Sequence, residues 1–310
     1  MPRSLPTVAA LVGHTPLVRL GKLASSLPGI EIHAKLEYFN PGGSVKDRPA
    51  LQMMRDAIAD GRLTRAHTLI DSTSGNTGVA YSWLGAALGY RVALVMPANV
   101  SAARKQIVAG YGAEVIYSDP MEGSDGAIRH VRRLVEAAPE RYFYPDQYSN
   151  PSNPQAHEVS TAPEIVAQTG DRVTHFVCGM GTSGTLMGTG RGLKAHRPGI
   201  QVVGVEPLEP MHGLEGLKHM ASSIVPGIYR EDGMDEKLSI STDEGWDMAE
   251  RLRDEEGLLV GHSAGAAMAG ALRIGERLAA TGSSGVIVTL FADRADRYFE
   301  PARWERDYGW

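Results

Sequence analysis

Residues 35–48 read KLEYFNPGGSVKDR and place Lys46 directly after a Pro-Gly-Gly turn, where a helix is expected to begin. The positive end of a helix dipole lies at that terminus, so it favours loss of the proton from a lysine there. Partial burial would act in the same direction, because it disfavours the charged ammonium. A lysine that is partly neutral near pH 7 can attack a carbonyl group and form a Schiff base. An ordinary solvated lysine in a first helical turn is the alternative that this stretch alone leaves open.

The bulk composition is that of a globular protein. At 310 residues the chain is long enough for one large domain or two lobes, with 43% apolar and 22% charged residues. A net charge of −5 argues against nucleic acid or an anionic membrane as the main partner. The single cysteine, Cys178, excludes an internal disulfide and fits a reducing cytoplasm. We find no apolar leader and no apolar run long enough for a membrane span.

Short apolar runs alternate with helical patterns along the chain. Continuous apolar runs suit strands that are buried on both faces, so the alternation predicts an α/β fold with mostly parallel sheets. Strands are expected at residues 32–36, 68–70, 92–96, 115–117, 175–178, 202–205 and 286–291. Helices are expected at about 44–60, 78–88, 101–110, 123–137, 184–195, 242–255 and 264–280. Ligands of such sheets bind at the carboxyl ends of the strands, which directs attention to three loops.

The first loop, DSTSGNTG at residues 71–78, lies between an expected strand and an expected helix. Its hydroxyl groups and backbone N–H groups at a helix N-terminus suit a carboxylate or a phosphate. A tight turn capped by Ser and Thr side chains is the alternative, although the hydroxyls exceed what one cap requires.

The second loop, GMGTSGT at residues 179–185, follows another expected strand. Its glycines allow close approach of a phosphate, and its hydroxyls can bind the phosphate oxygens. The same glycines spell G-x-G-x-x-G, and Glu206 ends the next strand, as in a dinucleotide-binding fold. An NAD-dependent oxidoreductase is therefore an alternative, but it would leave Lys46 and the first loop without a role.

The third loop, GHSAGA at residues 261–266, precedes the last long helix. Ser263 offers a neutral hydroxyl that can meet a heterocycle nitrogen, or it can serve as an ordinary N-cap. The histidines lack the spacing of a metal site, so no metal is expected.

A Schiff-base lysine, a phosphate loop, a carboxylate loop and a hydroxyl for a ring nitrogen together describe a pyridoxal phosphate site. From residue 13 to about residue 298 the chain resembles the cysteine synthases of the fold-type II pyridoxal phosphate enzymes, and among them the cysteine synthase B branch. The motifs that carry the resemblance are N-P-x-x-S-x-K-D-R at 40–48, T-S-G-N-T-G at 73–78, D-Q-Y-x-N-P at 146–151, M-G-T-x-G-T at 180–185 and D-R-x-D-R-Y at 293–298.

The resemblance implies a tryptophan synthase β-like fold with two three-layer αβα lobes. Residues 1–40 and 147–310 would form the large cofactor-binding domain, and residues 41–146 a small mobile domain that binds substrate. A cytoplasmic homodimer acting on small molecules is expected. Serine acetyltransferase is a partner of some relatives, but the B-branch similarity does not favour it here.

The resemblance also assigns residues. Lys46 would hold the cofactor as a Schiff base and then act as general acid and base, while Asn76 would bind the ring oxygen and Ser263 the pyridine nitrogen. The cofactor phosphate would be bound by Gly181, Thr182, Ser183, Gly184 and Thr185. The substrate carboxylate would be bound by Thr73, Ser74, Thr77 and Gln147. Lys218 would suit a phosphate on the substrate or an anionic sulfur donor such as thiosulfate. His262 stands where relatives usually carry an aliphatic residue.

The expected reaction is β-elimination from an O-activated L-serine, followed by addition of sulfide or another sulfur nucleophile to give L-cysteine. O-acetyl-L-serine is the first choice of donor and O-phospho-L-serine the second. A serine at the ring nitrogen, unlike an aspartate, does not hold that nitrogen protonated, which favours elimination over transamination. Cystathionine β-synthase activity shares these motifs and remains an alternative. A catalytically silent relative would be expected to have lost Lys46 or the phosphate loop.

Overall fold

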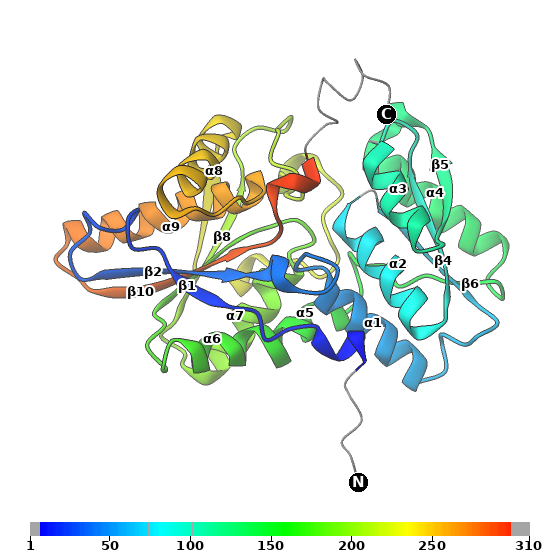
Figure 1. Ribbon diagram of the computed structural model, residues 1–310, viewed down its shortest axis with the longest axis horizontal. Coiled ribbons are helices and arrows are strands. Elements are labelled where there is room, and N and C mark those ends of the chain that lie inside the picture. Colours follow the sequence, from blue (N-terminus) through cyan, green and yellow to red (C-terminus); the bar gives the residue numbers. More distant parts are fainter. Residues whose placement is uncertain (1–6, 74, 101, 299–310) are drawn as a thin grey trace, which may run out of the picture.

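The computed structural model describes residues 7–73, 75–100 and 102–298, which are built around two separate β-sheets (Figure 1). The larger sheet has the strand order β1-β2-β10-β7-β8-β9, and only its β1–β2 pair is antiparallel. Its strands are β1 (Leu17–Arg19), β2 (Ile30–Leu36), β7 (His175–Gly179), β8 (Gln201–Pro207), β9 (Glu236–Ile240) and β10 (Gly285–Phe291). The smaller sheet has the order β5-β4-β3-β6 and is parallel throughout. Its strands are β3 (Thr68–Ser72), β4 (Arg91–Pro97), β5 (Glu114–Ser118) and β6 (Tyr142–Phe143).

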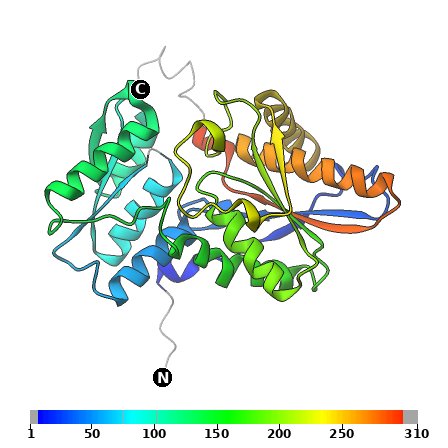
Figure 2. The same ribbon diagram turned by 180° about the vertical axis from the view of Figure 1, so that it is seen from behind.

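Helices cover both faces of each sheet, as Figures 1 and 2 show. The larger sheet lies between α8 (Thr242–Glu256) with α9 (His262–Ala280) on one side and α5 (Ser152–Ala156), α6 (Ala162–Gln168) and α7 (Gly184–His196) on the other. The smaller sheet carries α4 (Gly123–Ala137) on one face and α1 (Asp47–Ala59), α2 (Asn76–Leu88) and α3 (Ala102–Gly110) on the other. The expected α/β architecture of two three-layer units with mostly parallel sheets is thus confirmed.

Strand β4 explains why the apolar runs were continuous rather than alternating. Val92 and Leu94 pack in the core shared with α1 and α2, whereas Ala93 and Val95 pack in the core shared with α4. Because both faces of the strand are buried, every position along it favours an apolar side chain.

Several short elements complete the chain and were not predicted. Strand β9 has alternating exposure at the edge of its sheet, and α5 and α6 are short helices that each contain a proline. The remaining turns of helix are η1 (Val8–Leu11), η2 (Glu37–Phe39), η3 (Pro120–Glu122), a π-helical turn η4 (His157–Thr161), η5 (Met220–Ser222), η6 (Glu231–Gly233) and η7 (Ala295–Tyr298). Within the described ranges, no helix combines the length and the apolar character that crossing a membrane requires.

Among the helix boundaries that differ from the sequence-based expectation, the starts of α1 and α9 concern predicted site residues. Helix α1 begins at Asp47 with Lys46 as its N-cap, not at residue 44. Helix α9 begins at His262, and Gly261 with an extended backbone is its N-cap. The alternative that Ser263 is merely an N-cap is therefore wrong, because Ser263 already lies inside the first helical turn.

A buried group of charged side chains holds α1 in place. Arg48 donates to both oxygens of Glu37 and to both oxygens of Glu164 at 2.7–2.8 Å. The ammonium of Lys35, a buried residue, lies 2.6 Å from Glu164 and also donates to the carbonyl of Thr15. Because each charge is paired, the group can stay buried and fix the N-terminal turn of α1, two residues from Lys46.

Candidate active site

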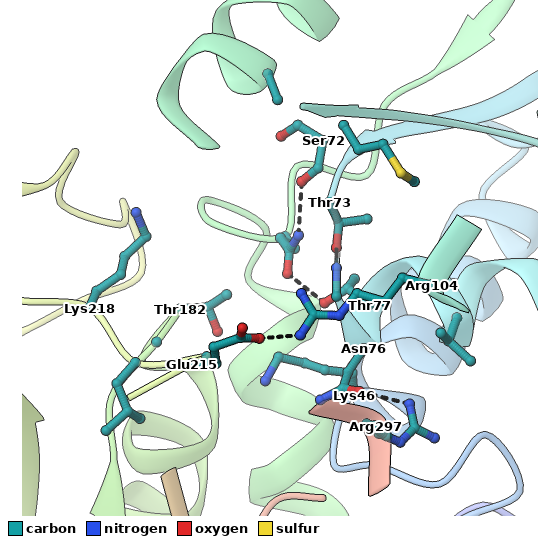
Figure 3. Close-up of a pocket in the computed structure, with 18 of the residues that line it drawn as sticks. Lys46, Ser72, Thr73, Asn76, Thr77, Arg104, Thr182, Glu215, Lys218 and Arg297 are labelled. Carbon is teal, nitrogen blue, oxygen red and sulfur yellow. Dashed lines mark hydrogen bonds and ion pairs between the residues drawn. The ribbon is translucent and has the colours of Figure 1, made fainter. Parts of the chain in front are cut away.

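A cavity of about 510 Å³ opens where the loops after β3, β4, β7, β8 and β10 converge. A smaller cavity of about 50 Å³ adjoins it and shares Lys46, Asn76 and Thr182 with it. Figure 3 shows residues from both halves of the molecule around the larger cavity, among them Lys46, Thr77, Thr182 and Lys218. The carboxyl ends of the strands in both sheets therefore meet at one cleft, as parallel sheets require of their ligand sites.

Lys46 lines both cavities of this cleft. Burial lowers the pKa of its ammonium, and the nearby Asp293 carboxylate partly opposes that shift. The N-terminus of α1 adds its positive dipole end at the same position. The surroundings of Lys46 thus favour its neutral, nucleophilic form.

The loop after β7 forms a cradle in front of helix α7. A Cβ atom on Gly184 would lie 2.0 Å from Asn153 Oδ1, and one on Gly181 would lie 2.1 Å from the Gly216 carbonyl, so both positions require glycine. Ser183 has a left-handed backbone with φ of 67° and is the N-cap of the 13-residue helix α7. Its buried Oγ has no hydrogen-bond partner within the described part of the chain.

The cradle suits a phosphate group. Thr182 Oγ1 receives the Gly184 N–H at 3.3 Å, and Thr185 Oγ1 lies 3.3 Å from Nε2 of the buried His157. Hydroxyl groups, backbone N–H groups and the positive end of a helix dipole are the donors that bind phosphate in proteins. The five residues predicted for the cofactor phosphate are thus adjacent in space, and they fit that group.

Three residues predicted for the substrate carboxylate, Thr73, Thr77 and Gln147, lie close together around the loop after β3. Thr77 Oγ1 donates to Gln147 Oε1 at 2.8 Å, and Gln147 Nε2 donates to the carbonyl of Ser72 at 3.4 Å. Thr73 lines the same cavity, and its Oγ1 accepts the Gly75 N–H at 3.3 Å. Ser74 lies outside the described residues.

Ser263 lines the smaller cavity from the first turn of α9. The preceding His262 stacks on Trp246, with ring centroids 4.2 Å apart, and is absent from the described lining of both cavities. Burial lowers the pKa of the His262 imidazole. A neutral hydroxyl therefore faces the site at this position, while the unusual histidine is engaged with Trp246.

Lys218 lines the larger cavity on the side opposite the β3 loop. Its ammonium lies 3.9 Å from Asp125 Oδ1 and 5.2 Å from the centre of the Tyr148 ring. Burial lowers its pKa. Figure 3 shows Lys218 across the site from Ser72, Thr73 and Thr77.

Further residues of the cleft were not predicted from the sequence. Arg104 of α3 pairs with Glu215 and lies 5.2 Å from the centre of the Tyr298 ring, so it joins the two halves at the mouth of the cavity. Asp293 and Arg297 both contact Asn76. The D-R-A-D-R-Y motif was the signal for the last two, whereas no local pattern marks Arg104.

The dinucleotide alternative loses its acidic residue in the structure. Glu206 accepts the Met220 N–H at 3.2 Å and lies 3.1 Å from the ammonium of Lys237. These contacts tie it to the chain that follows β8 and leave a ribose no free carboxylate. Among the described residues, no group of three or more His, Cys, Asp or Glu side chains could hold a metal ion.

Comparison with known proteins agrees with this geometry. A family model described as pyridoxal-phosphate dependent enzyme matches residues 8–293. The chain is similar to a cysteine synthase of Aquifex aeolicus, with 51% identity over 298 residues that cover 96% of this chain and 91% of the relative. It is similar to a cysteine synthase B of Pseudomonas aeruginosa, with 42% identity over 94% of this chain and 95% of the relative.

A solved structure leads to the same family. The crystal structure of a cysteine synthase from Entamoeba histolytica matches with a TM-score of 0.89 and 36% identity, covering 96% of this chain and 90% of that one. Fold, phosphate cradle and sequence similarity agree over nearly the whole chain. The chain therefore belongs to the cysteine synthase family of pyridoxal-phosphate-dependent enzymes.

Proposed function

We propose that the protein makes L-cysteine from an O-activated L-serine, with O-acetyl-L-serine as the first choice of donor and O-phospho-L-serine as the second. Sulfide or another small sulfur nucleophile would supply the sulfur. The observation that carries the proposal is the meeting of Lys46, the phosphate cradle and the β3 loop around one cavity. Lys46 and the cradle would hold the cofactor, and the β3 loop would hold the substrate. The fold sets the distances between them.

Lys46 is proposed to hold the cofactor and to move the proton at the substrate α-carbon. Bound pyridoxal phosphate supplies an electron sink that stabilises negative charge at that carbon. Because burial lowers its pKa, Lys46 is more readily neutral, as a group that accepts the α-proton must be. Ser263 would keep the pyridine nitrogen unprotonated, and Asn76 would bind the ring oxygen.

The phosphate cradle would fix the phosphate end of the cofactor, and the β3 loop would fix the carboxylate of the substrate. Gly181, Thr182, Ser183, Gly184 and Thr185 are proposed to bind the cofactor phosphate, supported by the glycine contacts and the unpaired Ser183 hydroxyl described above. Thr73, Ser74, Thr77 and Gln147 are proposed to bind the substrate carboxylate. Held at both ends, the α-carbon would be kept within reach of Lys46.

The choice of donor is proposed to depend on Lys218. Its ammonium faces the cavity with one acidic neighbour at 3.9 Å, which leaves it able to meet an anionic group. A phosphate on the substrate, or thiosulfate as the nucleophile, would gain a charge-assisted contact there. A neutral acetyl group would gain less.

We also propose the large-scale organisation that the family resemblance implies. Residues 1–40 and 147–310 would form the cofactor domain, and residues 41–146 a smaller domain that closes over the substrate. A cytoplasmic homodimer is proposed, without a requirement for serine acetyltransferase. The single cysteine, Cys178, is free and can form no internal disulfide, which suits a reducing compartment.

The visible spectrum of the purified protein tests the proposal. We expect a Schiff-base band near 410 nm, roughly, once pyridoxal phosphate is bound, and a change of that band when O-acetyl-L-serine is added. Subsequent sulfide should restore the band and release cysteine, while homocysteine in place of sulfide tests the cystathionine alternative. A response to O-phospho-L-serine alone would make the second donor the substrate. A protein that takes up no pyridoxal phosphate contradicts the proposal.

A further inference from the structure

The side-chain amide of Asn76 is held by two residues that follow β10 in the sequence, Asp293 and Arg297. Arg297 Nη1 donates to Asn76 Oδ1 at 2.7 Å, and Asn76 Nδ2 donates to Asp293 Oδ2 at 2.5 Å. Figure 3 shows Lys46, Asn76 and Arg297 next to one another, with the bond from Arg297 to Asn76 marked. Asn76 and Arg297 are 221 residues apart in sequence, so only the fold brings them together.

These two contacts determine which way the amide faces. A guanidinium only donates hydrogen bonds, so it selects the oxygen of the amide, and a carboxylate selects the nitrogen. A flipped amide would set two donors against each other at Arg297 and two acceptors against each other at Asp293. One N–H of Asn76 then remains for a ligand in the cavity, and its role there is that of a donor.

Asp293 is suited to this task. It is 1% exposed, and its Oδ2 also accepts a hydrogen bond from the hydroxyl group of Tyr298. Burial raises the pKa of Asp293, while the hydrogen bonds from Tyr298 and Asn76 act against that rise. Its carboxylate is therefore held by donors on one oxygen and lies in the wall of the cavity that contains Lys46.

Arg297 reaches the Lys46 segment as well. Its second terminal nitrogen donates to the carbonyl of Gly42, in the turn that precedes Lys46. Gly43 has φ of 76°, and a Cβ atom there would lie 2.3 Å from Arg297 Nη2, so this turn has room for the guanidinium only with glycine. One side chain thus sets the position of Asn76 relative to that of the Lys46 turn.

We propose that Arg297 and Asp293 are positioning residues that fix the Asn76 amide as a hydrogen-bond donor toward the ring oxygen of the cofactor. The inference rests on the proposed function, because it requires Asn76 to meet that oxygen. It assigns the last part of the D-R-A-D-R-Y motif to the cofactor site rather than to local packing.

A double-mutant cycle tests the proposal. The dissociation constant of pyridoxal phosphate and the position of its visible band are measured for Arg297→Met, Asn76→Ala and the double variant. We expect Arg297→Met alone to weaken cofactor binding about tenfold or more and to shift the band, since an oriented hydrogen bond is lost. In the Asn76→Ala background the same substitution should change binding less than about twofold.

Arg294→Met is the matched control, because Arg294 belongs to the same motif but is exposed and pairs with Asp296 at 3.4 Å. It should bind the cofactor as the wild type does. If Arg297→Met does not fold, Arg297→Lys takes its place in the cycle, since a lysine keeps the charge but lacks the fork that reaches Gly42 and Asn76 together.

Two results overturn the inference. Equal effects of Arg297→Met in both backgrounds would mean that Arg297 acts through the Gly42 turn alone, and an effect no larger than that of Arg294→Met would mean that it has no role toward the cofactor. Wild-type protein that binds no cofactor contradicts the proposed function itself. A coloured wild type with additive substitutions overturns only the inference.

Discussion

Asp71, at the end of β3, is a buried carboxyl group close to the β3 loop. Its Oδ1 accepts the Ser72 N–H at 2.7 Å, and its Oδ2 has no hydrogen-bond partner in the part of the chain that the structure describes. Burial raises its pKa from 3.8 to about 7, and the charge of Asp146 contributes to the rise. Between these two pH values the folded protein holds a proton that the unfolded chain has released.

The sign of the pH dependence follows from this difference. Since the folded state binds more protons, stability from this group is largest below about pH 4 and is lost as pH rises toward 7. Asn at position 71 stays neutral at every pH, so Asp71→Asn should stabilise the protein more at pH 8 than at pH 5, by at most about 3 kcal/mol. Thermal midpoints at the two pH values measure the difference. The exposed Asp232→Asn is the control, and a pH-independent effect of Asp71→Asn contradicts the assignment.

Lys218 carries the prediction about donor choice. If its ammonium meets the substrate phosphate, Lys218→Ala should raise KM for O-phospho-L-serine about tenfold or more, because a charge-assisted contact is lost. KM for O-acetyl-L-serine should change less than about threefold. The control is Lys194→Ala, which removes a lysine of α7 that is paired with Asp235. An equal rise of KM for both donors would mean that Lys218 contributes to the shape of the cavity but does not contact the substrate phosphate.

At the scale of elements, α1 depends on the buried charges around Arg48. Arg48→Ala would leave Glu37 and Glu164 without their main partner, and breaking a buried ion pair costs about 3–5 kcal/mol. Denaturant unfolding should show a loss of that size, whereas Arg55→Ala, on the exposed side of the same helix, should stay within about 0.5 kcal/mol. A loss below about 1 kcal/mol for Arg48→Ala would show that the group does not stabilise α1.

Sequence patterns predicted best the elements whose amino-acid composition follows from a single physical requirement. The run at β4 is apolar because helices cover both of its faces, and α7 follows a glycine-rich loop that admits no other residue at Gly181 or Gly184. Strand β9 has exposed positions at a sheet edge, so its composition carries a weak signal. His157 lies in a π-helical turn between the short helices α5 and α6.

The contacts that complete the site depend on the tertiary fold. Arg104 meets Glu215 over 111 residues and Arg297 meets Asn76 over 221, and no local pattern encodes such pairs. Lys46 could be predicted because its turn and helix start are local features. Its surroundings, with Asp293 and Cys178 nearby, come from the loop after β10 and from β7 and were not visible in the sequence.

For the whole molecule, the arrangement of two sheets accounts for the cleft. The segment 41–146 supplies Lys46, Asn76 and the β3 loop, while the chain that follows it supplies the phosphate cradle, between β7 and α7, and Ser263 of α9. Both sheets direct their carboxyl ends to this place (Figure 1). Closure of the smaller unit is proposed to bring the substrate loop onto a cofactor held by the larger one.

The central claim is that Lys46 holds pyridoxal phosphate in this cleft, and borohydride reduction of the loaded protein tests it most directly. Reduction makes the lysine–cofactor bond permanent, so peptide mass spectrometry can locate it. We predict one labelled peptide, with the label on Lys46, and no label in Lys46→Arg. A label on Lys218 or on any other lysine in the wild type, or none at all, would contradict the account.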